Sequence, residues 1–159
     1  MVIILPIRDR LGLPESQRWF VVRLLILVGC CILVNESESD PFFTNCEISD
    51  CEHDGIVFVN RSAGTMIDCT IFNNRLAGIT CTSRSKPVFR NCQIYNGRDV
   101  GVLLLDRSEA YFKNCQIYSN KLAGIEIKNG ANPTVTNSVI RDGETGGIYF
   151  NTKGNGFFR

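Results

Sequence analysis

The sequence predicts a single all-β domain built as a parallel β-helix, a coil of short strands that stacks on itself. Two markers recur every 23 residues without an insertion, and no repeat unit contains a long stretch with the 3.6-residue periodicity of a helix. The first marker is a tetrapeptide of the type Asn-Cys-Gln-Ile, which begins at residues 45, 68, 91, 114 and 137. The second is Gly followed by Ile or Val, at residues 55, 78, 101, 124 and 147. Strands that recur this closely without intervening helices predict stacked coils.

Composition is that of an ordinary globular protein and excludes several functions. The 159 residues suit one domain. Lys and Arg number 17 against 16 Asp and Glu, and this net charge of +1 argues against a protein built for bulk binding of nucleic acid. The single histidine excludes metal centres that need two imidazole ligands. We therefore expect no nucleic-acid partner and no metal or other cofactor.

The chain divides into an N-terminal segment, residues 1–31, and a repeat region, residues 32–159. Residues 19–34 are apolar except for Arg23. The uninterrupted apolar run Leu24–Val34 has 11 residues, short of the about 20 that a membrane-spanning helix needs. The sequence therefore leaves a membrane association of this segment open.

Three interpretations fit the end of the N-terminal segment. It is a signal peptide or anchor, a helix or strand that caps the open end of the stack, or an earlier coil. The coil interpretation matches residues 32–35 and 41–43 to residues 125–128 and 133–135. That match is in register only if about two residues are missing.

Within each unit we predict two short strands separated by turns. The first strand alternates, as in Ile125-Glu126-Ile127-Lys128, which directs Ile inward and charge outward. The second strand is represented by residues 87–94 and bends near Asn91, and pairs such as Asn96-Gly97 supply the turns. Stacking then forms four inward columns: Ile56, Ile79, Val102, Ile125 and Ile148; Phe58, Cys81, Leu104, Ile127 and Phe150; Met66, Phe89, Phe112 and Val135; and Ile71, Ile94, Ile117 and Ile140.

A further column holds cysteines, namely Cys46, Cys69, Cys92 and Cys115, and Ser138 continues it. Stacked strands lie about 4.8 Å apart with parallel Cβ vectors, whereas a disulfide needs converging Cβ atoms about 3.8 Å apart. Ligands in a straight column also cannot surround a zinc ion tetrahedrally. We therefore interpret these residues as buried thiols that fill the core, which is typical of a cytoplasmic or nuclear protein.

The repeat predicts no catalytic constellation. A polysaccharide lyase, hydrolase or epimerase needs carboxylates clustered on adjacent coils. Neither outward column supplies such a pair: one is Val57, Thr80, Leu103, Glu126 and Tyr149, and the other is Glu47, Thr70, Gln93, Gln116 and Val139. The histidine lies in Glu52-His53-Asp54, which we interpret as a solvated corner, with a general base as the alternative. We therefore expect a protein that is not an enzyme.

Two outward columns of basic residues are the candidate binding sites. The first is Arg61, Arg84 and Arg107, with Lys153 two periods beyond, and the second is Arg75, Arg98 and Lys121. Like charges about 4.8 Å apart repel by about 0.9 kcal/mol even in bulk water, and an anionic partner relieves that repulsion. The alternative is that the side chains spread into solvent beside Asp106 and Glu109. If the first column binds a partner, charge reversal at its three arginines abolishes binding without changing the melting temperature.

A longer period of 46 residues carries a family resemblance. Pro41, Pro87 and Pro133 keep this step, and so do the phrases Leu76-Ala77-Gly78 and Leu122-Ala123-Gly124. Over about residues 42–159 the chain resembles the repeats of the F-box only protein 11 family, most closely at residues 96–102, 122–127, 131–135 and 145–149. The resemblance implies a right-handed β-helix and a truncated or divergent member of that family.

In that family the β-helix recognises substrates for an SCF-type ubiquitin ligase. The resemblance therefore implies a protein-binding module in protein ubiquitination, which is at most the substrate-recognition part of a ligase and has no catalytic residue of its own. Its expected partner is a protein substrate with an anionic segment, and its expected location is the cytoplasm or nucleus. No F-box pattern precedes residue 42 and no zinc-finger cluster follows the repeats, so a Skp1-type adaptor joins only if an F-box is supplied elsewhere.

An interpretation from another class is a secreted or membrane-anchored β-helix that binds or modifies carbohydrate. It draws on the apolar segment at residues 19–34 and on the glycosylation sequons that begin at Asn35 and Asn60. Processing of the N-terminus, glycosylation, or cleavage of carbohydrate supports this interpretation. Co-purification of Skp1 or of ubiquitylated substrates supports the first.

Overall fold

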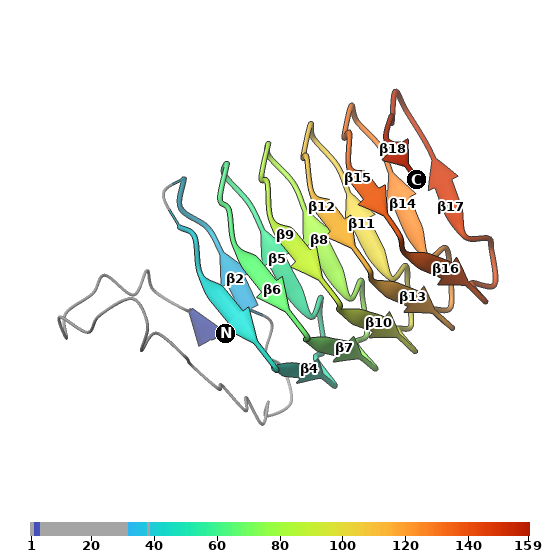
Figure 1. Ribbon diagram of the computed structural model, residues 1–159, viewed down its shortest axis with the longest axis horizontal. Helices are drawn as coiled ribbons and strands as arrows, with labels where there is room; N and C mark the ends of the chain where they lie inside the picture. Colours follow the sequence, from blue (N-terminus) through green and yellow to red (C-terminus); the bar gives the residue numbers. More distant parts are fainter. Residues whose placement is uncertain (1, 4–31, 38) are drawn as a thin grey trace, which may run out of the picture.

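The chain winds into a coil of short strands that form three parallel sheets along its axis, as Figure 1 shows. The structure is a computed structural model and describes residues 2–3, 32–37 and 39–159. The predicted parallel β-helix is confirmed. The interpretations of the N-terminal segment as a cap or targeting sequence fall on residues 4–31, which lie outside the described residues.

The three sheets are named here A, B and C in the order in which the chain visits them. Sheet A contains β1 (Val2–Ile3), β2 (Ile32–Val34), β5 (Ile56–Phe58), β8 (Ile79–Cys81), β11 (Val102–Leu104), β14 (Ile125–Ile127) and β17 (Ile148–Phe150). Sheet B contains β3 (Phe42–Thr44), β6 (Thr65–Ile67), β9 (Val88–Arg90), β12 (Tyr111–Lys113), β15 (Thr134–Thr136) and β18 (Phe157–Phe158). Sheet C contains β4 (Glu47–Ser49), β7 (Thr70–Phe72), β10 (Gln93–Tyr95), β13 (Gln116–Tyr118) and β16 (Val139–Arg141).

Each complete coil has three strands, where the sequence predicted two. The predicted second strand is broken between sheets B and C by a residue in the left-handed region, with φ between 49° and 55° at Asn45, Asp68, Asn91, Asn114 and Asn137. Asn and Asp adopt this conformation more readily than other residues with a side chain. The break turns the chain onto a new face, which explains the Asn or Asp that begins the first sequence marker.

The glycine of the second marker lies where successive coils approach closely before sheet A. A Cβ atom at Gly101 would lie 2.7 Å from the Gly124 carbonyl oxygen and 2.6 Å from the Asn120 side-chain nitrogen. Such distances leave no space for a side chain. Glycine at this corner therefore allows successive coils to stack closely, which explains why it recurs every 23 residues.

The strands pair in the register that the period predicts, as when Ile79 pairs with Ile56 and with Val102. The first coil differs, because Ile32 pairs with Ile56, 24 residues on. Phe42 pairs with Thr65 at the usual 23, so the extra residue lies in the turn between β2 and β3. The expectation that about two residues are missing here was wrong: this coil has one residue more.

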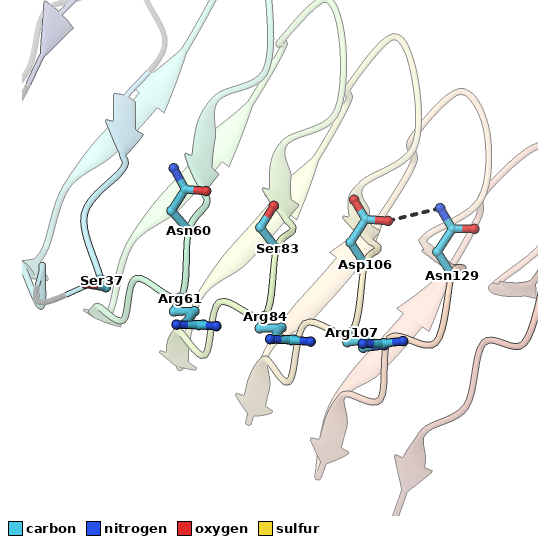
Figure 2. A pocket seen from close by; sticks show the side chains of 8 residues that line it. All are labelled: Ser37, Asn60, Arg61, Ser83, Arg84, Asp106, Arg107 and Asn129. Atoms are coloured by element: carbon cyan, nitrogen blue, oxygen red, sulfur yellow. Dashed lines mark hydrogen bonds between the residues drawn. The ribbon is translucent and has the colours of Figure 1, made fainter.

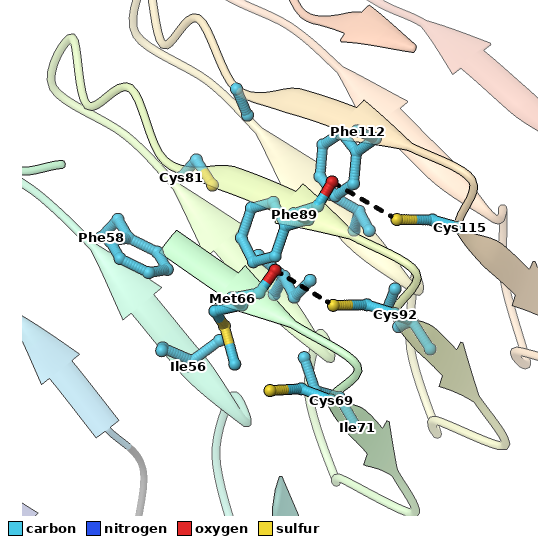
Figure 3. Packing of buried hydrophobic residues seen from close by; sticks show 14 of the residues in the cluster. Ile56, Phe58, Met66, Cys69, Ile71, Cys81, Phe89, Cys92, Phe112 and Cys115 are labelled. Carbon is cyan, nitrogen blue, oxygen red and sulfur yellow. Dashed lines mark hydrogen bonds between the residues drawn. The ribbon is translucent and has the colours of Figure 1, made fainter. Parts of the chain in front are cut away.

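The four predicted inward columns form one core inside the coil. Figure 3 shows Phe58, Phe89 and Phe112 meeting there, with the rings of Phe89 and Phe112 stacked 4.7 Å apart. Burial weakens in the last coil, where Ile148 is 36% and Phe150 49% exposed. The core is thus continuous along the axis, and the inner coils are covered by a neighbour on each side.

The cysteine column is buried beside this core, as predicted, and its thiols also donate hydrogen bonds. Cys69 Sγ donates to the carbonyl of Ile67 and Cys92 Sγ to that of Arg90, each at 3.3 Å. Ser138 makes the same contact with Thr136 at 3.0 Å, which explains how serine continues the column. Burial raises the pKa of the Cys81 thiol, and contact with the Cys115 and Cys69 thiols raises that of Cys92. Both groups therefore stay protonated at neutral pH.

Candidate anion-binding groove

The first predicted basic column lies on a row of identical tight turns that join sheet A to sheet B. In the turn after β5, Asn60 and Arg61 both have positive φ, 54° and 61°, and Ser62 N donates to the Val59 carbonyl at 3.0 Å. Two central residues with positive φ and this closing bond describe a type I′ turn. The turns of the next coils repeat the arrangement at Ser83-Arg84, Asp106-Arg107, Asn129-Gly130 and Thr152-Lys153.

The arginine positions in these turns are conformationally costly. Arg61, Arg84 and Arg107 have φ of 61°, 63° and 61°, a region that costs a residue with a side chain about 1–2 kcal/mol. Gly130 occupies the same place in the next coil at φ 77° without that cost. Arginine therefore recurs where glycine would be more stable, although the left-handed conformation itself is common to turns throughout the coil, as at Asn73 and Lys153.

These turns line a shallow groove of about 440 Å³ that runs across successive coils. Figure 2 shows the three arginines in one row, pointing in the same direction, beside a second row of polar side chains. The lining residues are Ser37, Asn60, Arg61, Ser83, Arg84, Asp106, Arg107 and Asn129. Sequence analysis identified the arginines of this groove but missed the row Asn60, Ser83, Asp106 and Asn129, although the same 23-residue spacing marks it.

The polar row is partly engaged in hydrogen bonds between coils. Asp106 accepts from Thr82 Oγ1 at 2.8 Å and from Asn129 Nδ2 at 3.1 Å. Asn60 Nδ2 donates to Asn35 Oδ1 at 2.7 Å. The Ser83 hydroxyl, between Asn60 and Asp106 in the row, has no partner among the described residues. The groove therefore offers a ligand both free guanidinium groups and an available hydroxyl.

The groove arginines form no ion pair among the described residues, a property that they share with Arg98 and Lys121 of the second basic column. Arg75 pairs with Glu52 at 2.7 Å, Lys86 with Glu109 at 2.7 Å and Lys128 with Glu126 at 3.3 Å. In this part of the chain no carboxylate lies within ion-pair distance of the guanidinium groups of Arg61, Arg84 and Arg107. Glu109, which sequence analysis placed beside these arginines, is paired with Lys86 instead.

The second predicted basic column lies on a different edge, in the turns that lead from sheet C to sheet A. Arg75, Arg98 and Lys121 are exposed there and line no part of the groove. Their main-chain N–H groups bond to the preceding coil, as when Arg98 N donates to the Asn74 carbonyl at 2.9 Å. The fold thus separates two columns that the sequence presents as equivalent.

An aromatic column on the outer face of sheet C was not predicted. Phe72, Tyr95 and Tyr118 stack with ring centroids 5.3 and 4.9 Å apart, and the Arg141 guanidinium lies 4.6 Å from the Tyr118 ring centroid. The residues are 23 apart, so their spacing was available in the sequence. Because the rings cover each other's faces, this column joins coils and presents mainly ring edges to solvent.

The acidic residues of the cluster predicted as a possible general base are held in contacts with other side chains. Of Glu52-His53-Asp54, Glu52 pairs with Arg75, and Asp54 accepts a hydrogen bond from Thr80 Oγ1 at 2.7 Å. Within the described ranges no three His, Cys, Asp or Glu side chains gather as they would around a metal ion. The described residues also contain no helix with the length and apolar character needed to cross a bilayer.

Comparison with known proteins agrees with this architecture. Residues 30–159 match the family described as "Right handed beta helix region", and the chain belongs to that family. Its fold is similar to that of the A-module of the mannuronan C-5 epimerase AlgE6 from Azotobacter vinelandii, with a TM-score of 0.64 and 18% sequence identity. The match covers 78% of this chain and 39% of the other. At this identity the likeness shows a shared fold.

Proposed function

We propose that this β-helix binds an extended anionic glycan along the arginine groove, without altering it chemically. The observation that carries the proposal is the row of unpaired guanidinium groups held in strained turns at Arg61, Arg84 and Arg107. Their mutual repulsion is relieved by a ligand that brings negative charge to each coil. The hydroxyl and amide groups beside them suit the hydroxyls of a sugar.

The spacing of the coils favours a glycan over a peptide. Parallel strands repeat at about 4.8 Å, whereas an extended peptide advances about 3.3 Å per residue. Neither neighbouring nor alternate peptide side chains therefore keep step with successive arginines. A linear chain of pyranose rings advances by about one ring length per sugar, which is close to the coil repeat. The fold shared with an enzyme that acts on mannuronan, itself an anionic glycan, supports the same class.

Binding without catalysis is proposed because carboxylates are few here: among the described residues the groove contains one, Asp106, and the outward face of the adjoining sheet A offers no pair. Its outward column contains a single acid, Glu126, and that carboxylate is paired with Lys128. A general acid and a base across one sugar would require a second carboxylate nearby. A glycan ligand also favours a secreted or membrane-anchored location over the cytoplasm and nucleus.

The test is binding of alginate, a polyuronate, by the intact chain in comparison with neutral dextran. The chain should bind alginate in a salt-sensitive manner and ignore dextran. Replacing Arg61, Arg84 and Arg107 together by Gln should abolish binding. The matched control replaces Arg75, Arg98 and Lys121 by Gln, which removes the same charge from the other edge and should leave binding nearly unchanged. Equal loss in both triple variants contradicts the proposal.

A second candidate is recognition of an acidic protein segment, as in the F-box only protein 11 family. The 46-residue phrases of the repeat favour it, because they resemble that family over about residues 42–159. An acidic peptide that binds through the three groove arginines while alginate does not would establish this candidate in place of the first. A role in ubiquitination further requires that the protein co-purify with Skp1.

A further inference from the structure

The charge along the groove is uneven from coil to coil. The turns after β5 and β8 each contribute one uncompensated arginine, Arg61 and Arg84, beside the neutral side chains Asn60 and Ser83. In the turn after β11, Arg107 lies next to Asp106, and after β14 the corresponding residues are Asn129 and Gly130. Positive charge is therefore concentrated at the end of the groove formed by Arg61 and Arg84.

The Arg61 and Arg84 turns are joined directly. Arg61 N donates to the Ser83 carbonyl at 2.9 Å, which fixes adjacent turns at the coil spacing of about 4.8 Å. The Arg61 and Arg84 side chains point in the same direction (Figure 2), so a ligand lying along the row meets a donor fork from each turn. A tetrahedral oxyanion has enough oxygens to accept from both forks and from the Ser83 hydroxyl. A carboxylate has two oxygens and is satisfied by one fork.

The Asp106 end of the groove has a different chemistry. Both carboxylate oxygens of Asp106 already accept hydrogen bonds, from Thr82 and Asn129, which hold the group in place. Its remaining lone pairs accept from hydroxyl donors and repel a second anion. This half of the groove is therefore suited to the neutral, hydroxyl-rich part of a ligand.

We propose that Arg61 and Arg84, with Ser83 between them, form a site for one sulfate monoester on the glycan, and that Asp106 binds a sugar hydroxyl farther along. The inference rests on the proposed function and names its ligand as a sulfated glycan in place of a simple polyuronate. It gives the groove a direction, with the acidic group toward β2 and the neutral group toward β14. A phosphomonoester has the same shape, and the experiment separates the two sources.

The experiment measures binding of a chondroitin sulfate oligosaccharide and of its desulfated form, which keeps the uronates. The sulfated form should bind about tenfold or more tightly, as expected for charged hydrogen bonds. Arg61→Gln and Arg84→Gln should each abolish that preference, whereas Arg107→Gln should weaken both forms equally. Arg84→Lys keeps the charge but loses the fork and should retain only part of the preference. Melting temperatures confirm that each variant is folded.

The outcomes distinguish this inference from the proposed function. Equal binding of both oligosaccharides, or loss of the preference in Arg107→Gln, overturns the sulfate site and leaves glycan binding intact. Tighter binding of a phosphoserine peptide of equal charge overturns the assignment to a glycan. Failure of the sulfated, desulfated and alginate chains to bind overturns the proposed function as well. Competition by inorganic sulfate, beyond that of chloride at equal ionic strength, supports the site.

Discussion

Replacing Arg84 by glycine is predicted to stabilise the fold while weakening ligand binding. Arg84 has φ of 63°, and relief from a left-handed conformation is worth about 1–2 kcal/mol, partly offset by the about 0.5–1 kcal/mol that glycine loses in chain entropy. At the middle of both ranges the net gain is about 0.75 kcal/mol. Arg84 also has an arginine on each side, so up to about 1.8 kcal/mol of repulsion disappears at low ionic strength.

Thermal unfolding followed by circular dichroism measures both the relief of backbone strain and the relief of charge repulsion. At 1 M salt, where the screening length is about 3 Å, only the strain contribution remains and the melting temperature should rise by about 1–4 °C. At low salt the rise should be larger. Ser83→Gly is the matched control, because it relieves a φ of 52° without changing charge, and its gain should not depend on salt. An Arg84→Gly variant that is no more stable than the wild type at either salt concentration refutes the argument.

Three further predictions concern the arginine row of the groove, the aromatic residues of the core and of the outer face, and the buried cysteine thiols. Gly130→Arg should extend the arginine row and tighten alginate binding while costing about 1–2 kcal/mol of stability, since a Cβ there meets Arg107 Cγ at an ordinary 3.5 Å; unchanged affinity would contradict the role of the row. Phe112→Ala should lower the free energy of unfolding by about 3–5 kcal/mol in a denaturant titration, because that ring is fully buried. Tyr118→Ala, in the aromatic column on the outer face, should lower it by about 1 kcal/mol. Similar losses in the two variants would contradict this difference. Burial raises the pKa of the Cys81 thiol and so favours the protonated folded state. Its contribution to stability is intact below the unfolded thiol pKa of about 8.5 and is lost as the pH rises above it, by about 1.4 kcal/mol per pH unit. Melting temperatures at neutral and alkaline pH check this, and Cys81→Val should flatten the dependence.

The columns of the core could be predicted because each depends only on the period. Residues such as Ile79 and Val102 occupy equivalent places in successive coils, so a constant step of 23 is enough to stack them. The third strand of each coil could not be predicted in the same way. It arises from a single left-handed residue such as Asn91, and the sequence on both sides of that residue has the pattern of one continuous strand.

The groove could be predicted only in part. Its arginines stand out as a charged column, but their own turns do not, because type I′ turns are recognised by glycine and Ser83-Arg84 contains none; only the equivalent pair Asn129-Gly130 has that signal. Periodicity also does not show which of Arg84 and Arg98 is the better candidate for a binding site, because the two belong to columns of equal spacing. Only the path of the chain places the first in a groove with Asp106 and the second on another edge.

The most direct test of the proposed function is nuclear magnetic resonance of the arginine side-chain Nε–Hε groups during addition of an alginate oligosaccharide. Binding along the groove predicts shifts for Arg61, Arg84 and Arg107 at the same ligand concentration, with Arg75 and Arg98 unchanged. Shifts confined to Arg75 and Arg98, or no shift at any arginine up to the highest oligosaccharide concentration used, would contradict it.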